Sequence, residues 1–527
     1  MVVSVSPEAS DVGRVVLERG GNAVDASVAV ALALAVTYPE AGNIGGGGFM
    51  LVWPGAGEQP VCIDYRETAP AAATPDMFVA DRAPYTHKAV GVPGTLRGLE
   101  LAHRRWGKLP WRDLVAPAIA LAADGFAIDR NIAEELTKTA AKPTTSTEFR
   151  HVFSKPDGTA WQAGDRLVQA ELAATLRLIA AEGADAFYRG VVADQIVAEM
   201  RAGGGLISAA DLATYEAKAR TPIHGTYRGF DVFGPPPPSS GGICLVEMLN
   251  ILENFDLPSQ DRFAPRTVHL MIEAMRRAYC DRARYLGDAD FVNIPTRLTS
   301  KDYARQLAAG IDLNHATPSA ALAPELSLTV EGESTTHFSI VDAQRMAVAN
   351  TYTLQESFGA RIVVRGAGFL LNNEMTDFNA RPGHTDRRGA IGTPANVIAP
   401  GKRMLSSQSP TIVAREGRLR LVTGSPGGRT IPNTVLCVLL NALDFQMDVQ
   451  AAVDAPRLHH QWLPERVTFE LADEPNNQPL VRELRALGHV VVAKPREQGD
   501  AHTIYVRGEV LEGAADTRQA VGKAAGY

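Results

Sequence analysis

The sequence predicts a layered protein of the α/β or α+β class. A helix that is apolar almost all round is expected over residues 23–36, and a continuous apolar strand over 49–53. Two runs rich in strand-forming residues, 335–342 and 346–354, are separated by three residues, a spacing typical of a hairpin. Strands covered by helices on both faces give a layered architecture.

The N-terminal half supplies most of the expected helices. Ser6 followed by Pro7 opens a helix that runs through Leu17, because Ser caps a helix, Pro suits its first turn, and the following glycine pair ends it. After the buried helix and strand, residues 61–66 alternate in polarity and are expected to form a second strand. From about residue 96 to 200 the periodicity is mainly helical.

The C-terminal half is richer in strands. The Pro-Pro-Pro-Pro-Ser-Ser run at 235–240 is predicted to be a rigid turn inside one domain, because a helical pattern resumes at 245–252. Residues 317–331 lack aromatic residues and periodicity, which predicts an exposed, loosely held stretch. Further strands are expected at 362–364, 411–414, 419–422, 467–470 and 502–506, and further helices at 432–443 and 477–487.

Composition argues against several function classes. With 52 basic and 59 acidic residues the net charge is −7, so no basic excess exists to neutralise nucleic acid or anionic lipid. The longest nearly uninterrupted apolar run, 26–36, is shorter than the roughly 20 residues of a membrane span. The chain start lacks a secretory signal, which predicts a cytoplasmic protein, or a periplasmic or secreted one whose leader was removed.

No metal or other cofactor is predicted. The four cysteines are far apart, without metal-ligand spacing, and are expected to be buried structural thiols. His459 and His460 are adjacent and would point apart. The glycines at 45–48 follow a helix and precede a strand, the reverse of a dinucleotide fingerprint, so they are expected to allow close backbone packing.

A second glycine-rich segment, 423–428, follows a strand and leads into a helix. It lacks the Lys of a phosphate-binding loop, and it is either a plain turn or a nest of N–H groups for an oxyanion. Upstream, Ser334-Thr335-Thr336 places hydroxyls where a loose segment meets a strand. Thr acts as a nucleophile if its own α-amine is freed by cleavage, although Thr is also common at strand starts.

Several motifs in one order resemble the γ-glutamyltranspeptidases, also called glutathione hydrolases. They extend from the first helix almost to the last residues: GGNAVDA at 20–26, the glycines at 45–48, DYRE at 64–67, TTHFS at 335–339, LNNEMTDF at 371–378, MLSSQSPT at 404–411, TGSPGG at 423–428, PRLHHQW at 456–462 and DTR at 516–518.

The resemblance implies an N-terminal nucleophile hydrolase, an αββα sandwich formed by two chains cut from one precursor. Residues 1–334 would form the large subunit and residues 335–527 the small subunit. After cleavage the two subunits would remain bound to each other. Cleavage would separate Ser334 from Thr335, and Thr335 would be both the processing residue and the catalytic nucleophile. The implied substrate is a small γ-glutamyl compound such as glutathione, with water or an amino acid or peptide as acceptor.

The resemblance also assigns residues to each part of the substrate. Arg66, with Ser406 and Ser407, would bind the α-carboxylate, and Glu374 and Asp377 the α-ammonium. Gly427 and Gly428 would form the oxyanion hole with their N–H groups. Thr353 would orient the α-amine that cleavage releases, and Arg518 would form an ion pair with Glu374 or Asp377.

Two departures from the family pattern lie beside the predicted pocket. Gln355 stands in the substrate-binding position where many members carry Asn, and Arg388 stands where the lid loop, 382–393, has an aromatic residue. Both lead us to expect that hydrolysis dominates over transfer of the γ-glutamyl group to an amine.

The alternatives are a cephalosporin (glutaryl) acylase and an unprocessed binding protein. Glu374 and Asp377 favour the γ-glutamyl substrate, because a neutral acyl chain would leave both acids without a partner.

Overall fold

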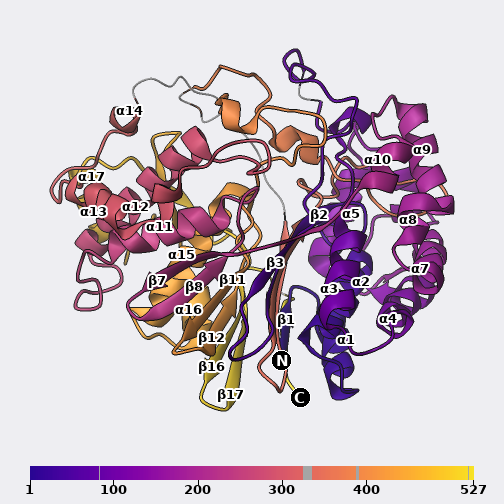
Figure 1. Ribbon diagram of the computed structural model, residues 1–527, viewed down its shortest axis with the longest axis horizontal. Coiled ribbons are helices and arrows are strands. Elements are labelled where there is room, and N and C mark those ends of the chain that lie inside the picture. Colours follow the sequence, from indigo (N-terminus) through magenta and orange to yellow (C-terminus); the bar gives the residue numbers. More distant parts are fainter. Residues whose placement is uncertain (82, 324–334, 387, 389–390, 520) are drawn as a thin grey trace.

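Two β-sheets packed face to face lie between two layers of helices in the computed structural model (Figure 1). The structure describes residues 1–527 except 82, 324–334, 387, 389–390 and 520. The strands within each of the two main sheets pair antiparallel, which makes this an α+β protein. The predicted αββα sandwich is confirmed.

The first main sheet has seven strands and the second has six. In spatial order the first contains β18 (Lys523–Ala525), β1 (Val2–Ser4), β9 (Thr336–Val341), β10 (Ala347–Thr353), β2 (Gly47–Trp53), β3 (Val61–Asp64) and β6 (Lys218–Arg220). The second contains β17 (Val510–Ala515), β16 (His502–Arg507), β12 (Arg418–Thr423), β11 (Thr411–Arg415), β8 (Phe230–Gly234) and β7 (Ile223–Tyr227).

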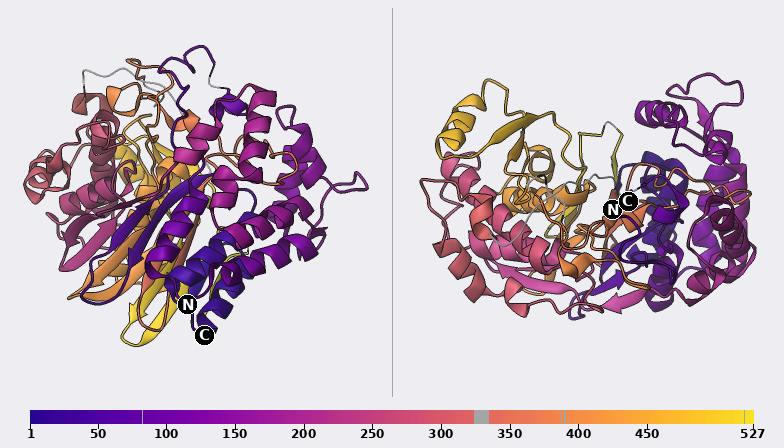
Figure 2. Two further views of the ribbon diagram at one scale, coloured as in Figure 1. Left: turned by 45° about the vertical axis from the view of Figure 1, so that its right-hand side comes forward. Right: turned by 90° about the horizontal axis from the view of Figure 1, so that it is seen from above.

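The expected hairpin forms the centre of the first sheet. β9 pairs with β10, Val341 opposite Ala347, and β10 pairs in turn with β2. On its other edge β9 pairs with β1, which pairs with β18, so the two chain termini lie side by side (Figures 1 and 2). Thr335, the residue before β9, therefore lies at one end of the central hairpin.

The helices form two layers, one from residues 7–214 and the other from residues 241–486 (Figure 1). The layer on the first sheet contains α1 (Pro7–Glu18), α2 (Ala23–Thr37), α3 (Thr95–Trp106), α4 (Trp111–Asp124), α5 (Arg130–Ala140), α6 (Thr147–Phe153), α7 (Ala170–Glu182), α8 (Asp185–Arg189), α9 (Val191–Gly203) and α10 (Ala209–Thr214). The layer on the second sheet contains α11 (Gly241–Leu252), α12 (Pro265–Tyr285), α13 (Lys301–Ala309), α14 (Ser319–Leu322), α15 (Ile431–Leu443), α16 (Val449–Asp454) and α17 (Gln478–Ala486). Two small sheets contain β4 (Phe126–Ala127) and β5 (Arg166–Leu167), and β13 (Leu458–His459), β14 (Val467–Glu470) and β15 (Val491–Lys494).

Apolar side chains fill all three interfaces between the layers. Phe49 and Leu51 of β2 face the second sheet, whereas Met50 and Val52 face the helices, so the strand is apolar throughout because both of its faces are buried. α2 is buried along its whole length, and Asn22 caps it through a reciprocal contact with Asp25. The helices expected at 6–17 and 23–36 are confirmed.

Glycines at 45–48 allow close backbone packing, as expected. A Cβ atom on Gly45 would lie 2.1 Å from the Leu370 carbonyl oxygen, and one on Gly46 would lie 2.0 Å from that of Thr353. The Pro-rich run precedes α11 directly, and Ser239 and Ser240 within it are fully buried. It is therefore a turn inside the fold. All four cysteines are buried, as expected.

Two expectations about local structure were wrong. Residues 362–364 form no regular strand, and only Val363 makes an isolated bridge, to Leu370. Within 317–331, Ser319 starts the short helix α14 and is fully buried, so the expectation of a stretch exposed throughout was wrong, although residues 318, 320 and 321 are exposed. Its remainder, from residue 324, and Ser334 lie outside the described residues.

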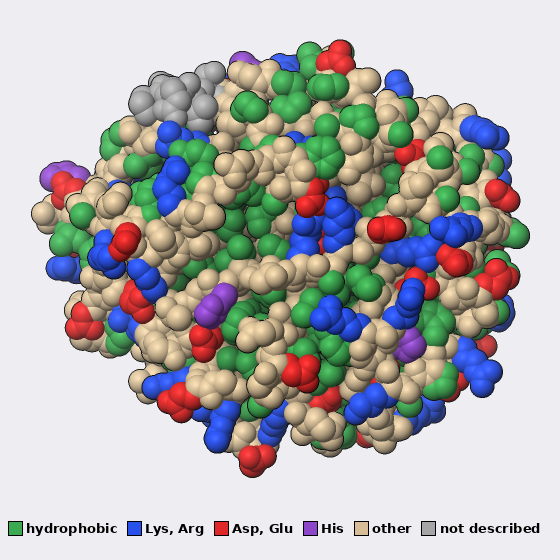
Figure 3. Space-filling model, viewed as in Figure 1, with side chains coloured by type: hydrophobic (Ala, Val, Ile, Leu, Met, Phe, Trp, Pro, Cys, Tyr) green, Lys and Arg blue, Asp and Glu red, His purple; other side chains and the backbone are tan. Residues whose placement is uncertain are grey.

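Basic and acidic side chains are interspersed on the face of the molecule that Figure 3 shows. Apolar side chains lie between them, as on most protein surfaces. In the described part of the chain, no helix combines the length and apolar character that crossing a bilayer requires.

Candidate active site

A single cavity brings together nearly all residues that the sequence singled out. Thr335 lines it and is 8% exposed. The cavity also contains eight of the other predicted site residues: Arg66, Thr353, Gln355, Glu374, Asp377, Ser406, Ser407 and Gly428. These residues come from the ends of β3, β9 and β10, from a 3-10 helix and from the loops before β11 and α15.

Arg66 forms the charged centre of this cavity. It follows β3, and its side chain is 1% exposed. Nη1 lies 2.7 Å from Oε2 of Glu374, and Nη2 lies 2.5 Å from Oδ2 of Asp377. Both acids belong to the 3-10 helix Glu374–Asp377. A planar guanidinium thus contacts two carboxylates that are presented by a single helical turn.

Three carboxyl groups surround this one guanidinium. The third carboxyl group belongs to Glu67, whose Oε2 lies 3.6 Å from Nη1 of Arg66. Burial raises the pKa of Glu67 to about 8, and Arg66 only partly opposes this shift. Burial also raises the pKa of Glu374 well above its usual value, again against the attraction of Arg66. The site therefore has more acidic than basic groups around Arg66, which suits a bound cation such as an ammonium group.

Thr353 and Gln355 connect the central hairpin to these acids. Thr353 ends β10, and its hydroxyl accepts a hydrogen bond from the backbone N–H of Gln355, at 2.8 Å. Gln355 has a φ of +84°. Its side-chain amide donates to Oδ1 of Asp377 at 3.4 Å. The backbone turn after β10 therefore directs the Gln355 side chain towards the carboxylate pair.

The glycine-rich segment after β12 borders Thr335 from another direction. Gly427 has a φ of +123° and Gly428 one of +50°, conformations that glycine adopts without strain. The Thr430 hydroxyl donates to the Gly427 carbonyl at 2.8 Å and fixes the turn. Gly428 lines the main cavity, whereas Gly427 lines a second cavity, which also contains Thr335. Thr335 thus lies between two cavities.

Ser406 and Ser407 are held by neighbouring loops. Ser240 donates from its backbone N–H and from its hydroxyl to the Ser406 carbonyl, at 2.8 and 2.7 Å. The Ser407 hydroxyl accepts from Nη2 of Arg282 at 2.9 Å. Both serines are nearly buried and line the main cavity. Their hydroxyls therefore have fixed positions beside the charged cluster.

Comparison with known proteins decides the family. The γ-glutamyltranspeptidase family model matches residues 9–527. The chain belongs to this family. The resemblance that the sequence motifs indicated is confirmed.

Relatives within the γ-glutamyltranspeptidase family match over nearly the whole chain. The glutathione hydrolase proenzyme of Escherichia coli (strain K12) is 46% identical over 537 residues, covering 100% of this chain and 92% of that protein. The acylase ACY 1 proenzyme of Pseudomonas sp. (strain SE83) is 38% identical, covering 98% and 91%. The crystal structure of cephalosporin acylase from Bacillus halodurans has a TM-score of 0.87 at 28% identity, covering 100% of this chain and 95% of that chain.

One expected ion pair of the family site was wrong. Arg518 does not pair with Glu374 or Asp377. Its guanidinium contacts Glu470, with Nε 2.9 Å from Oε1, and Asp516, with Nη1 3.0 Å from Oδ1. Arg457 also contacts Asp516, at 2.6 Å. Arg518 therefore belongs to a separate buried ion-pair network.

Arg388, predicted at the gating position of the lid loop, is exposed. Its backbone N–H donates to Oδ1 of Asp386 at 2.6 Å. It is not among the residues that line the main cavity, although Ile391 and Thr393 from the same loop are. Its neighbours at 387 and 389–390 lie outside the described residues.

The sequence motifs missed two arginines of the main cavity. Arg429 directly follows the Gly427-Gly428 pair and could have been found from that position. Arg282 comes from α12, a helix with five arginines, where no spacing distinguished it from its neighbours. Only the packing of α12 against the Ser406–Ser407 loop reveals that it reaches the cavity.

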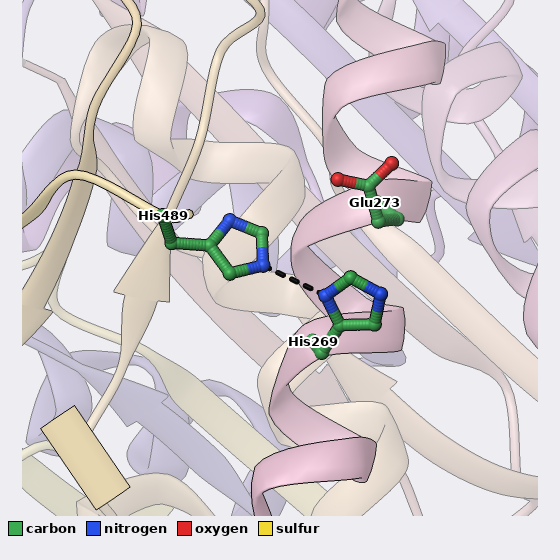
Figure 4. Close-up of side chains that lie close together, drawn as sticks. All are labelled: His269, Glu273 and His489. Atoms are coloured by element: carbon green, nitrogen blue, oxygen red, sulfur yellow. Dashed lines mark hydrogen bonds between the residues drawn. The ribbon is translucent and has the colours of Figure 1, made fainter. Parts of the chain in front are cut away.

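Outside the cavity, the buried side chains of His269, Glu273 and His489 lie close together (Figure 4). His269 contacts His489 through Nδ1 and the Asp312 carbonyl through Nε2, both at 2.8 Å. Glu273, the third member, pairs with Arg276 and Arg277. Because both nitrogens of His269 are engaged and two guanidinium groups occupy the carboxylate, these residues fit a hydrogen-bonded network rather than a cation site.

Proposed function

We propose that this chain is a self-processing γ-glutamyl hydrolase and transferase that acts through Thr335. The observation that carries the proposal is that Thr335 shares one buried cavity with the cluster of Arg66, Glu374 and Asp377. A γ-glutamyl group presents one carboxylate, one ammonium and a reacting carbonyl. The cavity offers a guanidinium, an excess of carboxylates and a hydroxyl, which match these three groups.

Processing comes first in the proposed sequence. The Thr335 hydroxyl attacks the carbonyl carbon of Ser334, the peptide C–N bond breaks, and an ester forms in its place. Water hydrolyses this ester, which leaves the carboxylate of Ser334 and the free α-amine of Thr335. The products are the large subunit, 1–334, and the small subunit, 335–527. Strands β9 and β10 of the small subunit pair with β1 and β2 of the large subunit, which supports the proposal that the two subunits remain bound after cleavage.

The freed amine then acts as the general base. Its ordinary pKa is about 7.7–8.0, so at neutral pH a usable fraction is unprotonated and takes the hydroxyl proton as Thr335 attacks the γ-carbonyl. Thr353, at the end of the neighbouring strand, is the proposed residue that orients this amine. The N–H groups of Gly427 and Gly428 are proposed to stabilise the oxyanion. The amine returns its proton to the leaving group as the amide bond breaks.

The resulting ester on Thr335 has two fates. Water releases glutamate, and an amino acid or peptide amine instead forms a new γ-glutamyl amide. In both steps the Thr335 amine removes a proton from the attacking group and returns it to the Thr335 oxygen. The second cavity beside Thr335, which contains Gly427, offers space for the leaving or incoming amine.

Recognition of the glutamyl group is assigned to the charged cluster. Arg66 is proposed to bind the α-carboxylate with help from Ser406 and Ser407, and Glu374 and Asp377 to bind the α-ammonium, with Gln355 holding Asp377. Acylase activity is the alternative, because the acylase proteins named above share the fold. A glutaryl group lacks the ammonium, and its binding would leave the excess of acidic groups around Arg66 without a second cation, which costs free energy.

The test compares two chromogenic amides that differ only in the ammonium group. The processed protein is expected to release p-nitroaniline from γ-glutamyl-p-nitroanilide at least about 30-fold more efficiently than from glutaryl-p-nitroanilide, as expected for loss of one buried charged contact. Preference for the glutaryl compound would support an acylase. Turnover of neither compound by a protein that remains one uncut chain would support a non-enzymatic role.

A further inference from the structure

Arg282 is a second guanidinium in the cavity, and it reaches the site from the opposite helical layer. It belongs to α12, is 7% exposed and lines the main cavity together with Thr335. Nε donates to the Ser240 hydroxyl and Nη2 to the Ser407 hydroxyl, both at 2.9 Å. Arg282 therefore connects α12 with the two loops that form this wall of the cavity.

The contact with Arg282 fixes the direction of the Ser407 proton. A guanidinium only donates hydrogen bonds, so the Ser407 oxygen is the acceptor in this contact. The single hydroxyl proton of Ser407 must then point elsewhere. Among the described residues, Ser407 Oγ donates to no recorded acceptor, and the side chain borders the cavity. Its proton is thus available to an acceptor that enters the cavity.

The charge of Arg282 makes Ser407 a stronger donor. A hydroxyl that accepts from a cation is polarised, and hydrogen bonds reinforce one another in a buried site of low dielectric constant. The acceptor that gains most is an anion. Arg66 already contacts two carboxylates, so a second cation near the serines improves the balance of charge for an incoming carboxylate.

We propose that Arg282 is a positioning residue for the substrate α-carboxylate, acting through Ser407. It holds the Ser407 oxygen as an acceptor, directs the hydroxyl proton into the cavity and adds positive charge behind it. The inference rests on the proposed γ-glutamyl activity. It assigns to Arg282 selectivity for acyl groups that carry an α-carboxylate, and not the acceleration of the chemical step at Thr335.

The test uses Arg282→Gln, which removes the charge, and Arg282→Lys, which keeps the charge but loses the forked geometry. Arg284→Gln is the matched control, because it neutralises a cation two residues away on the same helix. The substrates are γ-glutamyl-p-nitroanilide and 4-aminobutyryl-p-nitroanilide, which lacks only the α-carboxylate. Binding of free glutamate and of 4-aminobutyrate is measured alongside by calorimetry.

Arg282→Gln is expected to raise the KM for the γ-glutamyl substrate about tenfold, with kcat within about threefold, as for one lost charge-assisted contact. Binding of glutamate should weaken by a similar factor. The KM for the 4-aminobutyryl substrate and the binding of 4-aminobutyrate should change less than about twofold. Arg282→Lys should lie between wild type and Arg282→Gln, and Arg284→Gln should match wild type.

A double-mutant cycle separates this role from a purely structural one. Ser407→Ala should raise the same KM, and adding Arg282→Gln to it should cost less than about twofold more, because the two residues act in series. Equal losses for both substrates, or fully additive losses in the cycle, would overturn the inference. Absence of γ-glutamyl turnover in the wild type would instead refute the proposed function, and glutamate binding would still test Arg282.

Discussion

Nη1 of Arg66 lies 2.7 Å from Oε2 of Glu374, and both side chains are at most 1% exposed. The two residues lie on opposite sides of the bond before Thr335. The contact therefore joins the two proposed subunits at the cavity itself. Loss of Arg66 would leave Glu374 buried without its cation, which is costly, whereas loss of Glu374 would leave Arg66 in contact with Asp377.

Substitution of Arg66 by Ala tests the recognition of the carboxylate. Loss of a buried charged partner typically costs about 2–5 kcal/mol, which corresponds to roughly 30-fold or more in kcat/KM. We expect a loss of this size for γ-glutamyl-p-nitroanilide, with cleavage before Thr335 intact. Arg66→Lys is the control that keeps the charge. Turnover of Arg66→Ala within about twofold of wild type would show that the carboxylate binds elsewhere.

Glu67 makes the stability of the protein depend on pH. Burial raises the pKa of its carboxyl group to about 8, against about 4.3 in an unfolded chain. Between these values the folded state holds a proton that the unfolded state has lost, so the stability contribution falls as the pH rises and levels off above about 8.

Glu67→Gln should remove this pH dependence, because the amide resembles the protonated carboxyl in shape and does not ionise. We expect the Tm of the variant, relative to wild type, to be higher at pH 9 than at pH 5. Differential scanning fluorimetry at both values is sufficient. If the Tm of the variant minus that of wild type is the same at both pH values, or is larger at pH 5, then Glu67 is ionised in the folded protein.

The ratio of hydrolysis to transfer depends on how the acyl group is held near Thr335. Gln355 is one methylene longer than the Asn that the family pattern led us to expect, and its side-chain amide lies 3.4 Å from Oδ1 of Asp377. Because transfer needs tighter geometry than attack by water, glycylglycine should raise p-nitroaniline release less than about twofold, with glutamate as the main product. Gln355→Asn should increase the share of γ-glutamyl-glycylglycine found by chromatography. Strong stimulation of the wild type by glycylglycine would contradict this prediction.

The sequence predicted the central elements of the fold because local and long-range signals agreed there. The apolar pattern of α2 and the continuous apolar strand after the glycine segment both require burial, and the layers on either side of the first sheet supply it. At 362–364 the β-branched residues favour a strand, but the structure offers them only the single bridge at Val363. Strand propensity alone does not form a strand where no neighbouring strand is available for pairing.

The cavity was predicted through motifs, and its missed members lie outside them. Arg66 and Glu374 each stand in a recognisable motif, although 308 positions apart, and the fold brings them together. Arg282 is one of five arginines in α12, and only tertiary packing gives it a contact with Ser407. Arg518 was assigned to the wrong acids, because a motif identifies an arginine but not which of several buried carboxylates it meets.

The intact mass of the purified protein and of its Thr335→Ala variant tests the central claim most directly. The proposal that Thr335 is the nucleophile predicts that wild type separates into two chains, one ending at Ser334 and one beginning at Thr335, and that the variant remains a single chain. Brief incubation with γ-glutamyl-p-nitroanilide should then make the small chain heavier by one γ-glutamyl group. A Thr335→Ala variant that still cleaves at this bond, or a label that appears on the large chain, would contradict the account.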